Sequence, residues 1–339
     1  MVDIPAWAWV ATVGLIVVLF VFDLLVAVRR PHAVKLGEAT FWSVFYIAVA
    51  VVFGLVLWGL GGSTAGTEYF AGWIVEKSLS IDNLFVFVIV FSRFGVPEQY
   101  QQKALLFGIA AALALRTILI VVGAAAISLF SFTFLFFGLV LIWTAVQLIR
   151  HRKEEPEVED TWLVRRARKI LPVSSDFHGG RMLAHEDGQR VMTPLLLVFI
   201  AIGSTDLLFA LDSIPAVFGV TEEAFIVFTA NAFALLGLRA LFFLIEGLLE
   251  RLVYLSIGLS VILAFIGVKL ILLFLHEDVS NSIPEIPTPV SLGVILLILV
   301  VTTIASLLRV RTHPDERAHA GSLRKRRKES RSEEEATTS

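Results

Sequence analysis

Long apolar stretches constrain this chain more than any other feature of its sequence. A helix that crosses the hydrocarbon core of a bilayer needs about 20 consecutive apolar residues, and 57% of the 339 residues are hydrophobic. We predict nine membrane spans, at residues 7–28, 41–61, 71–92, 104–126, 128–149, 193–217, 222–246, 252–275 and 290–309. The expected fold class is therefore all-α, a polytopic transmembrane bundle of about nine helices.

Charged residues divide the chain into four regions. Only 17% of the residues are charged, against about 25% in a typical soluble domain. Residues 1–149 hold spans one to five, 150–192 form a charged cytoplasmic loop, and 193–309 hold spans six to nine. The last region, 310–339, is polar and poor in apolar residues, so we expect a disordered cytoplasmic tail.

The loops alternate between basic and non-basic along the chain. The loops after spans one, three and five and the C-terminal tail carry Lys and Arg, while 61–70, 218–222 and 276–289 contain neither. Because Lys and Arg favour cytoplasmic loops, we expect a multi-pass protein of the cell (plasma) membrane with its N-terminus outside and its C-terminus inside. The net charge of −2 favours no nucleic-acid partner. The expected partner at this point is the lipid bilayer, and a homo-oligomer is compatible with the sequence.

Two parts of the chain resemble each other. Three separate matches occur at an offset of 124 or 123 residues, and they relate 80–85 to 204–209, 94–98 to 218–222 and 115–116 to 238–239. Spans three to five then correspond to spans six to eight. Since three spans separate the copies, the copies run in opposite directions through the membrane. Such an inverted repeat is common in secondary transporters, whose ion sites lie near the bilayer midplane.

Several acidic residues fall inside the predicted spans. A carboxylate at mid-bilayer costs at least ~2.5–3.5 kcal/mol and is functional by default. Asp82 and Asp206 fall near the middle of spans three and six at equivalent positions of the repeat, while Glu76 and Asp212 fall in the outer halves and Asp23 near the inner end of span one. These five acids form a ladder across the membrane.

Helix geometry limits how these acids combine. Glu76 and Asp82 are six residues apart, as are Asp206 and Asp212, which means ~600° of rotation and ~9 Å of rise on a regular helix. Two acids of one helix therefore face different ways unless the helix is broken, and Gly203 is a candidate breaker, as is Pro215. A single-ion site more naturally joins Asp82 from one repeat to Asp206 from the other.

Oxygen atoms dominate the set of possible ligands. No Cys is present and no His lies in a predicted span, so the site suits Mg²⁺, Ca²⁺ or Mn²⁺ better than zinc or copper. The predicted metal ligands are Asp82, Asp206, Asp212, Glu76, Asn83 and Asn231, and Ser80 could add a hydroxyl. A proton relay through the same acids is an alternative.

Buried cations offer a plainer interpretation of the same acids. Lys77, Arg116, Arg239 and Lys269 also lie in spans, and buried carboxylates often pair with such residues. Arg116 and Arg239 occupy equivalent positions of the repeat. We interpret both as structural counter-charges, or as occupants of the empty site.

Longer motifs around these residues resemble the TerC family of integral membrane proteins. The motifs are EKSLSIDN at 76–83, VPEQYQ at 96–101, TPL at 193–195, DLLFALDSIPA at 206–216 and NAFALLGLRA at 231–240. The resemblance covers roughly residues 15–275. It implies efflux of divalent manganese, an association with tellurium resistance, and roles for Glu76, Asp82, Asp206 and Asp212. Many relatives carry a glutamate where this chain has Gly203.

These observations lead to one expected function and one alternative from another class. The first is a secondary transporter that exports divalent cations, most of all Mn²⁺, in exchange for protons. The alternative is a membrane scaffold that binds stress-response or secretion partners through the 150–192 loop. Tellurite handling fits poorly, because an oxyanion path favours unpaired cations. The sequence contains no nucleotide-binding loop, no Ser/His/Asp set and no HExxH motif, so we expect neither an enzyme nor a resident cofactor.

Overall fold

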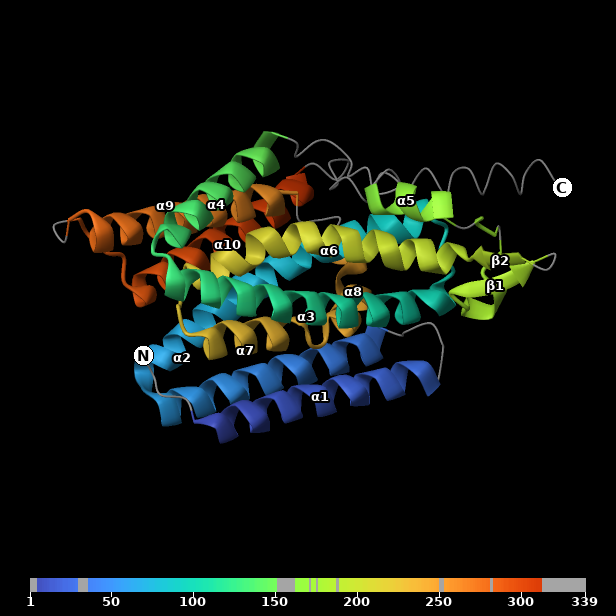
Figure 1. Cartoon of the computed structure of the whole chain (residues 1–339), viewed down its shortest axis with the longest axis horizontal. Helices are drawn as coiled ribbons and strands as arrows, with labels where there is room; N and C mark the ends of the chain where they lie inside the picture. The colour runs from blue at the N-terminus through green and yellow to red at the C-terminus, as the bar shows by residue number, and fades with distance from the viewer. Residues whose placement is uncertain are drawn as a thin grey trace.

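A computed structural model of the chain describes residues 5–29, 36–150, 162–170, 172–174, 176–186, 189–249, 253–280 and 283–312. The predicted all-α class is confirmed, because long helices run side by side along one common direction (Figure 1). The helices are α1 Ala6–Arg29, α2 Leu36–Arg93, α3 Glu98–Leu129, α4 Phe132–Arg150, α5 Trp162–Ile170, α6 Pro194–Phe218, α7 Ala224–Leu235, α8 Leu238–Leu249, α9 Leu255–Asp278 and α10 Thr288–Thr312. The predicted disordered tail beyond residue 312 lies outside the described residues.

The 58 residues of α2 form two antiparallel helices. Gly62 leaves the helical conformation, with φ 87° and ψ 174°. The Tyr69 hydroxyl donates a hydrogen bond to the Ala50 carbonyl at 3.0 Å, although a straight helix would separate these residues by about 28 Å. The chain therefore reverses at Gly62, where predicted spans two and three meet.

The number of spans agrees with the sequence prediction. Seven described helices are long and apolar enough to cross a membrane, and the pair α7 and α8, bent by 42° at a short break, raises the number to eight. Because α2 crosses twice, these helices supply the nine spans that the sequence predicts. The apolar lengths of the helices thus account for the membrane part of the fold.

The helix break lies in span seven rather than in span six. Helix α6 continues through both Gly203 and Pro215, so the predicted breakers do not interrupt it. Gly237, between α7 and α8, has φ 76°, and a Cβ there would lie 2.6 Å from Cβ of Tyr46. Glycine adopts this left-handed conformation without a steric penalty, so the chain bends at Gly237 and lets the Tyr46 side chain approach.

The inverted repeat remains a prediction. The repeat relates α3 to the α7–α8 pair, yet α3 is one continuous helix and its counterpart is broken.

Small residues bring some of the helices close together, as where a Cβ at Gly138 of α4 would lie 2.7 Å from the carbonyl oxygen of Gly267 in α9. Close approach through small residues is a common way for membrane helices to pack.

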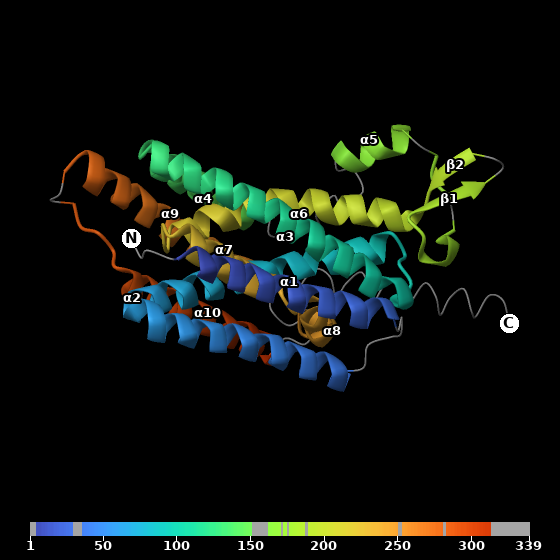
Figure 2. The same ribbon diagram turned by 60° about the horizontal axis from the view of Figure 1, so that its bottom comes forward.

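The 150–192 loop contains more structure than the sequence indicated. Besides α5, it holds a short helical turn, His178–Gly180, and the strands β1 Leu183–Glu186 and β2 Gln189–Met192, which pair antiparallel. We call residues 172–193 the cytoplasmic module, after the predicted location of this loop. Figures 1 and 2 place it at one end of the bundle, beside the start of α6.

Lys103 and Tyr100, near the start of α3, hold this module to the bundle. The Lys103 ammonium donates to the Gly180 carbonyl at 2.7 Å, and the Tyr100 ring stacks on Phe177 with centroids 5.8 Å apart. The sequence analysis, which described 150–192 only as a charged loop, therefore did not identify this folded structure. Strands of four residues are too short for a clear alternating pattern, which is the signal that identifies strands in a sequence.

Candidate cation site

A buried arginine joins three helices near the middle of the bundle. Arg116 of α3 has no exposed surface, and its guanidinium donates to Glu76 of α2 and to both carboxylate oxygens of Asp206 in α6, at 3.1 and 3.5 Å. Glu76 and Asp206 are themselves buried, at 0% and 2% exposure. The planar fork of donors in Arg matches such a double carboxylate contact. The site thus contains two acids and one permanent cation.

Two short polar side chains of α2 complete the contacts of this cluster. Asn83 accepts a hydrogen bond from Arg116 at 3.0 Å and donates to the Leu79 carbonyl at 3.2 Å, in the amide orientation that satisfies both of its groups. The Ser80 hydroxyl donates to Glu76 at 3.3 Å. Two of the neutral groups that the sequence analysis selected therefore lie at the site.

Several buried polar atoms of α2, α6 and α7 lack a partner among the described residues. The second carboxylate oxygen of Glu76, the Ser213 hydroxyl, and both amide atoms of Asn231 make no hydrogen bond with any described residue. Most buried polar groups in proteins are hydrogen-bonded, so each exception calls for an explanation such as an unseen water or ion. The oxygens among these atoms are of the kind that a hard cation binds.

Asn231 lies near the C-terminal end of α7, which ends at Leu235, shortly before the break at Gly237. Lys77 of α2 donates to the Ala234 carbonyl at 3.0 Å, and a Cβ at Gly72 of α2 would lie 3.4 Å from that of Ala230. These contacts place the Asn231 turn of α7 alongside residues 72–77 of α2. The ammonium of Lys77 satisfies a carbonyl that the helix end leaves open, and its charge complements the negative end of the helix dipole.

The other two predicted acids lie outside this cluster of contacts. Asp212 accepts a hydrogen bond from Thr144 of α4 at 2.8 Å. Asp82 is half-buried and makes no hydrogen bond or ion pair with the described residues. The sequence analysis expected two acids that are six residues apart on one helix to face different ways. The exposure of their side chains agrees, because Glu76 is buried and Asp82 is partly exposed on α2, and Asp206 is buried and Asp212 is partly exposed on α6. The direct pairing of Asp82 with Asp206 remains a prediction.

Arg116 explains the arrangement of the acids. Among the described residues, no three His, Asp or Glu side chains lie close enough together to hold a metal ion. The Arg116 guanidinium lies between Glu76 and Asp206. This position agrees with the sequence interpretation of Arg116 as a structural counter-charge or as the occupant of the empty site. The role of the six predicted ligands in binding a metal remains a prediction.

A second buried arginine forms a similar cluster elsewhere. Arg239 of α8 is 4% exposed and donates to both oxygens of Asp23 in α1, at 2.7 and 3.2 Å. Its third contact is the side-chain oxygen of Gln102 in α3, at 3.2 Å. Both arginines thus pair with carboxylates, as the plainer interpretation of the sequence expected. Asp23 lies at this second cluster and not at the first.

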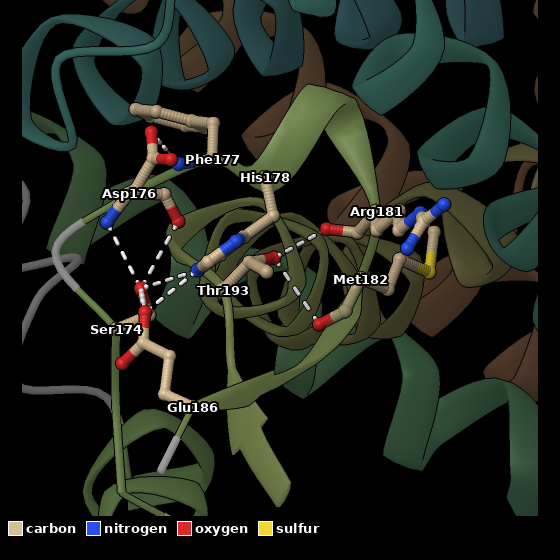
Figure 3. Close-up of polar contacts among 8 residues, drawn as sticks. All are labelled: Ser174, Asp176, Phe177, His178, Arg181, Met182, Glu186 and Thr193. Carbon is tan, nitrogen blue, oxygen red and sulfur yellow. Dashed lines mark hydrogen bonds and ion pairs between the residues drawn. The ribbon is translucent and has the colours of Figure 1, made fainter.

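The sequence analysis missed a polar cluster in the cytoplasmic module. Figure 3 shows Ser174, His178 and Glu186 converging. Glu186 accepts from Ser174 at 2.6 Å and lies 2.7 Å from the Nε2 atom of His178, and these hydrogen bonds lower the pKa of Glu186. Ser174 also lies 3.0 Å from the same nitrogen. A catalytic relay uses both ring nitrogens of the histidine, one for each partner. Here Ser174 and Glu186 both contact the same nitrogen, so the hydrogen bonds hold the segment together. We call this cluster of Ser174, His178 and Glu186 the clasp.

Fold and site together define a class of protein: a polytopic integral membrane protein with a carboxylate–arginine site buried among its helices. The chain belongs to the integral membrane protein TerC family, whose sequence pattern matches residues 61–313. The family assignment made from the motifs is thereby confirmed.

Full-length relatives are similar to nearly the whole chain. An uncharacterized membrane protein of Mycobacterium tuberculosis is 46% identical over 318 residues, covering 89% of this chain and 79% of the relative. An uncharacterized membrane protein of Myxococcus xanthus is 40% identical over 92% of this chain and 95% of its own length. The Alx protein of Escherichia coli K12, provisionally named a membrane-bound redox modulator, is 36% identical over 87% of this chain and 92% of its own length. No solved structure matches the chain.

Proposed function

We propose that this protein is a secondary transporter that exports divalent cations, with Mn²⁺ as its principal substrate. The observation that carries the proposal is the pair of buried carboxylates, Glu76 and Asp206, which lie on different helices and share one arginine. Burying two acids among membrane helices is costly, and such acids mark ion paths in membrane proteins. The unpartnered oxygens of Glu76 and Asn231 add ligands of the type that Mn²⁺ accepts.

Charge balance suggests how the site works. With Arg116 between them, the two carboxylates leave the site with one negative charge, and a divalent cation in place of the guanidinium would neutralise it. Arg116 and the cation therefore compete for the same acids. When the cation leaves, Arg116 returns and keeps the acids from remaining unpaired, which would be strongly unfavourable in a buried site. Protons that bind the same acids would provide the exchange.

The broken span supplies a place for movement. In secondary transporters, broken helices at the repeat interface line the substrate site, and here the α7–α8 break follows Asn231 by a few residues. We propose that α7 brings Asn231 into the ligand set when Arg116 withdraws. Asp82 and Asp212, on the less buried faces of the same helices, would serve as the next positions along the path.

Basic residues support the proposed orientation in the membrane. The cytoplasmic module and the start of α3, joined through Lys103, lie at one end of the bundle (Figure 1), and the last turn of α10 also carries basic residues, Arg309 and Arg311. Under the positive-inside rule this end faces the cytoplasm. We propose residence in the plasma membrane with the N-terminus outside.

Purified protein in liposomes tests the transport function. We expect Mn²⁺ flux under an imposed pH gradient, and a loss of at least about tenfold in both flux and Mn²⁺ binding for Asp206→Asn and for Glu76→Gln, because each removes a ligand charge. Asp23→Asn is the matched control, since it removes one acid from the other buried arginine and leaves the proposed site intact. Unchanged Mn²⁺ binding in both site variants, or an equal loss in the control, would overturn the proposal.

A further inference from the structure

Helix α5 has one apolar face and one basic face. Val164 and Ala167 are buried and belong to the same core cluster as Leu195 and Val198 of α6. Arg165, Arg166 and Lys169 are exposed. With 100° of rotation per residue, the two buried residues lie about 60° apart, and the three cations spread over about 100° on the opposite side of the helix.

The position of α5 places this basic face at the edge of the membrane. Figures 1 and 2 both show α5 running beside the first half of α6, roughly parallel to the bundle, and not beyond its end. Helix α6 is long and apolar enough to span a membrane from Pro194 onward, and α5 packs against Leu195 and Val198 in its first turns, so α5 lies near one end of that candidate span, where headgroups are expected. Its cations lie on the side of α5 opposite to the residues packed on α6.

The three cations have no protein partner in the part of the chain that the structure describes. None of Arg165, Arg166 and Lys169 makes a salt bridge or side-chain hydrogen bond there. Basic groups at a membrane surface attract anionic headgroups. Guanidinium groups in addition bind phosphate through paired donors.

We propose that α5 is a binding site for the phosphodiester headgroups of anionic phospholipids in the cytoplasmic leaflet. The site holds the headgroup through Arg165, Arg166 and Lys169, while Val164 and Ala167 fix the helix on α6. It lies outside the Glu76–Arg116–Asp206 cluster and does not depend on the cation that the protein transports. Anionic lipid thereby becomes a specific partner of this chain, and not only its solvent.

Lipid titration of the full-length protein in neutral detergent tests the site. The probes are short-chain phosphatidylglycerol and phosphatidylcholine with identical acyl chains, and binding is measured by native mass spectrometry. We expect Arg165→Gln with Arg166→Gln to weaken phosphatidylglycerol binding by about 25-fold, and added Lys169→Gln to bring the loss to about one hundredfold, from the typical effect of one surface cation. Phosphatidylcholine binding should not change.

A matched variant controls for net charge. Arg181→Gln with Arg190→Gln removes two exposed arginines of the cytoplasmic module, and it should retain phosphatidylglycerol binding. All substituted positions are exposed, so the melting temperature without lipid should stay at the native value. Arg165→Lys with Arg166→Lys keeps the charge and should retain most of the affinity.

Three outcomes would overturn the proposal. The first is native phosphatidylglycerol affinity in the α5 variant, which is also the result expected if the acidic segment 154–160 of the chain were the partner of these arginines. The second is an equal loss of affinity in the control variant. The third is displacement of the lipid by millimolar inorganic phosphate, which would indicate a site for soluble anions.

Discussion

At the scale of single residues, Arg116 occupies the centre of the candidate cation site. Its guanidinium contacts Glu76, Asp206 and Asn83, so it fills the position that a bound cation would need. In the proposed transporter, this arginine competes with the substrate cation for the two acids, so the strength of its ion pairs sets the apparent affinity for that cation. A lysine could not replace it, because one ammonium lacks the forked geometry that reaches two carboxylates at once.

Replacing Arg116 should expose the competition directly. We expect Arg116→Gln to destabilise the protein without metal by ~3–5 kcal/mol, because two buried acids lose their counter-charge. Added Mn²⁺ should then raise the melting temperature more in this variant than in the native protein. Arg239→Gln, which breaks the other buried pair, should be destabilised without gaining any extra response to Mn²⁺. A smaller Mn²⁺ response in Arg116→Gln than in the native protein contradicts the competition.

Gly203 offers a second test at this scale. It lies three residues before Asp206 on α6, and nothing lies within 4 Å of the position that its Cβ would occupy. The space that a longer side chain needs is therefore present where many relatives carry glutamate. We expect Gly203→Glu to raise Mn²⁺ affinity by at least about tenfold, because the number of ligand charges sets the affinity of oxygen sites. Binding measured by calorimetry checks this, with Gly203→Gln as the uncharged control.

At the scale of the elements, the break between α7 and α8 is the most distinctive feature. Three contacts maintain it: Gly237 supplies the left-handed turn, Lys77 binds the Ala234 carbonyl, and Arg239 ties the start of α8 to Asp23. The Lys77 and Arg239 contacts satisfy a backbone carbonyl and a buried charge inside the bundle, where water cannot replace lost hydrogen bonds.

A single methyl group should disturb this break. We expect Gly237→Ala to lower stability by at least ~1–2 kcal/mol, because alanine is strained at positive φ and its Cβ would collide with Tyr46. Gly293→Ala in α10 is the control, since that position is helical with open space around it and should be neutral or slightly stabilising. Melting temperatures in detergent report the difference, and equal values for the two variants would refute the role of Gly237.

At the scale of the whole molecule, the cytoplasmic module connects two helices of the cation site. Lys103 and Tyr100 fasten it to the start of α3, and β2 ends at Met192, directly before Thr193 and the start of α6. Because α3 carries Arg116 and α6 carries Asp206, a relative movement of these two helices has to strain or release the module. The module is therefore placed to restrain the helices that hold the site.

Acid should loosen the clasp inside this module. Hydrogen bonds from Ser174 and His178 lower the pKa of Glu186 below its ordinary value of 4.5. A group with a lowered folded-state pKa stabilises the fold above its unfolded-state pKa, and this contribution disappears as the pH falls through the folded-state value. We expect amide hydrogen exchange in 174–186 to accelerate below about pH 4.5, after correction for the intrinsic rate. Glu186→Gln should remove this additional pH dependence.

Much of the fold could be predicted from the sequence alone. The length of each apolar stretch determines the spans, because a helix of about 20 apolar residues is stable across the hydrocarbon core of a bilayer. Basic residues indicate which loops lie on the same side of the membrane. The ionisable residues within the spans could also be identified from the sequence. The α7–α8 break was not, because Gly237 resembles other glycines in the sequence, and only its contact with Tyr46 requires the left-handed turn. The β-hairpin was missed because its strands are short.

The sequence by itself determined the class of the protein, its number of spans and the residues that carry charge inside the membrane, because each of these follows from local composition and the cost of charge in lipid. Only the tertiary structure decided which charges meet. Glu76 joins Asp206 through Arg116, and Asp23 joins Arg239, because residues 40 to 216 positions apart face each other only after the helices pack. Partner choice depends on helix rotation and neighbouring side chains, which no local pattern in the sequence records.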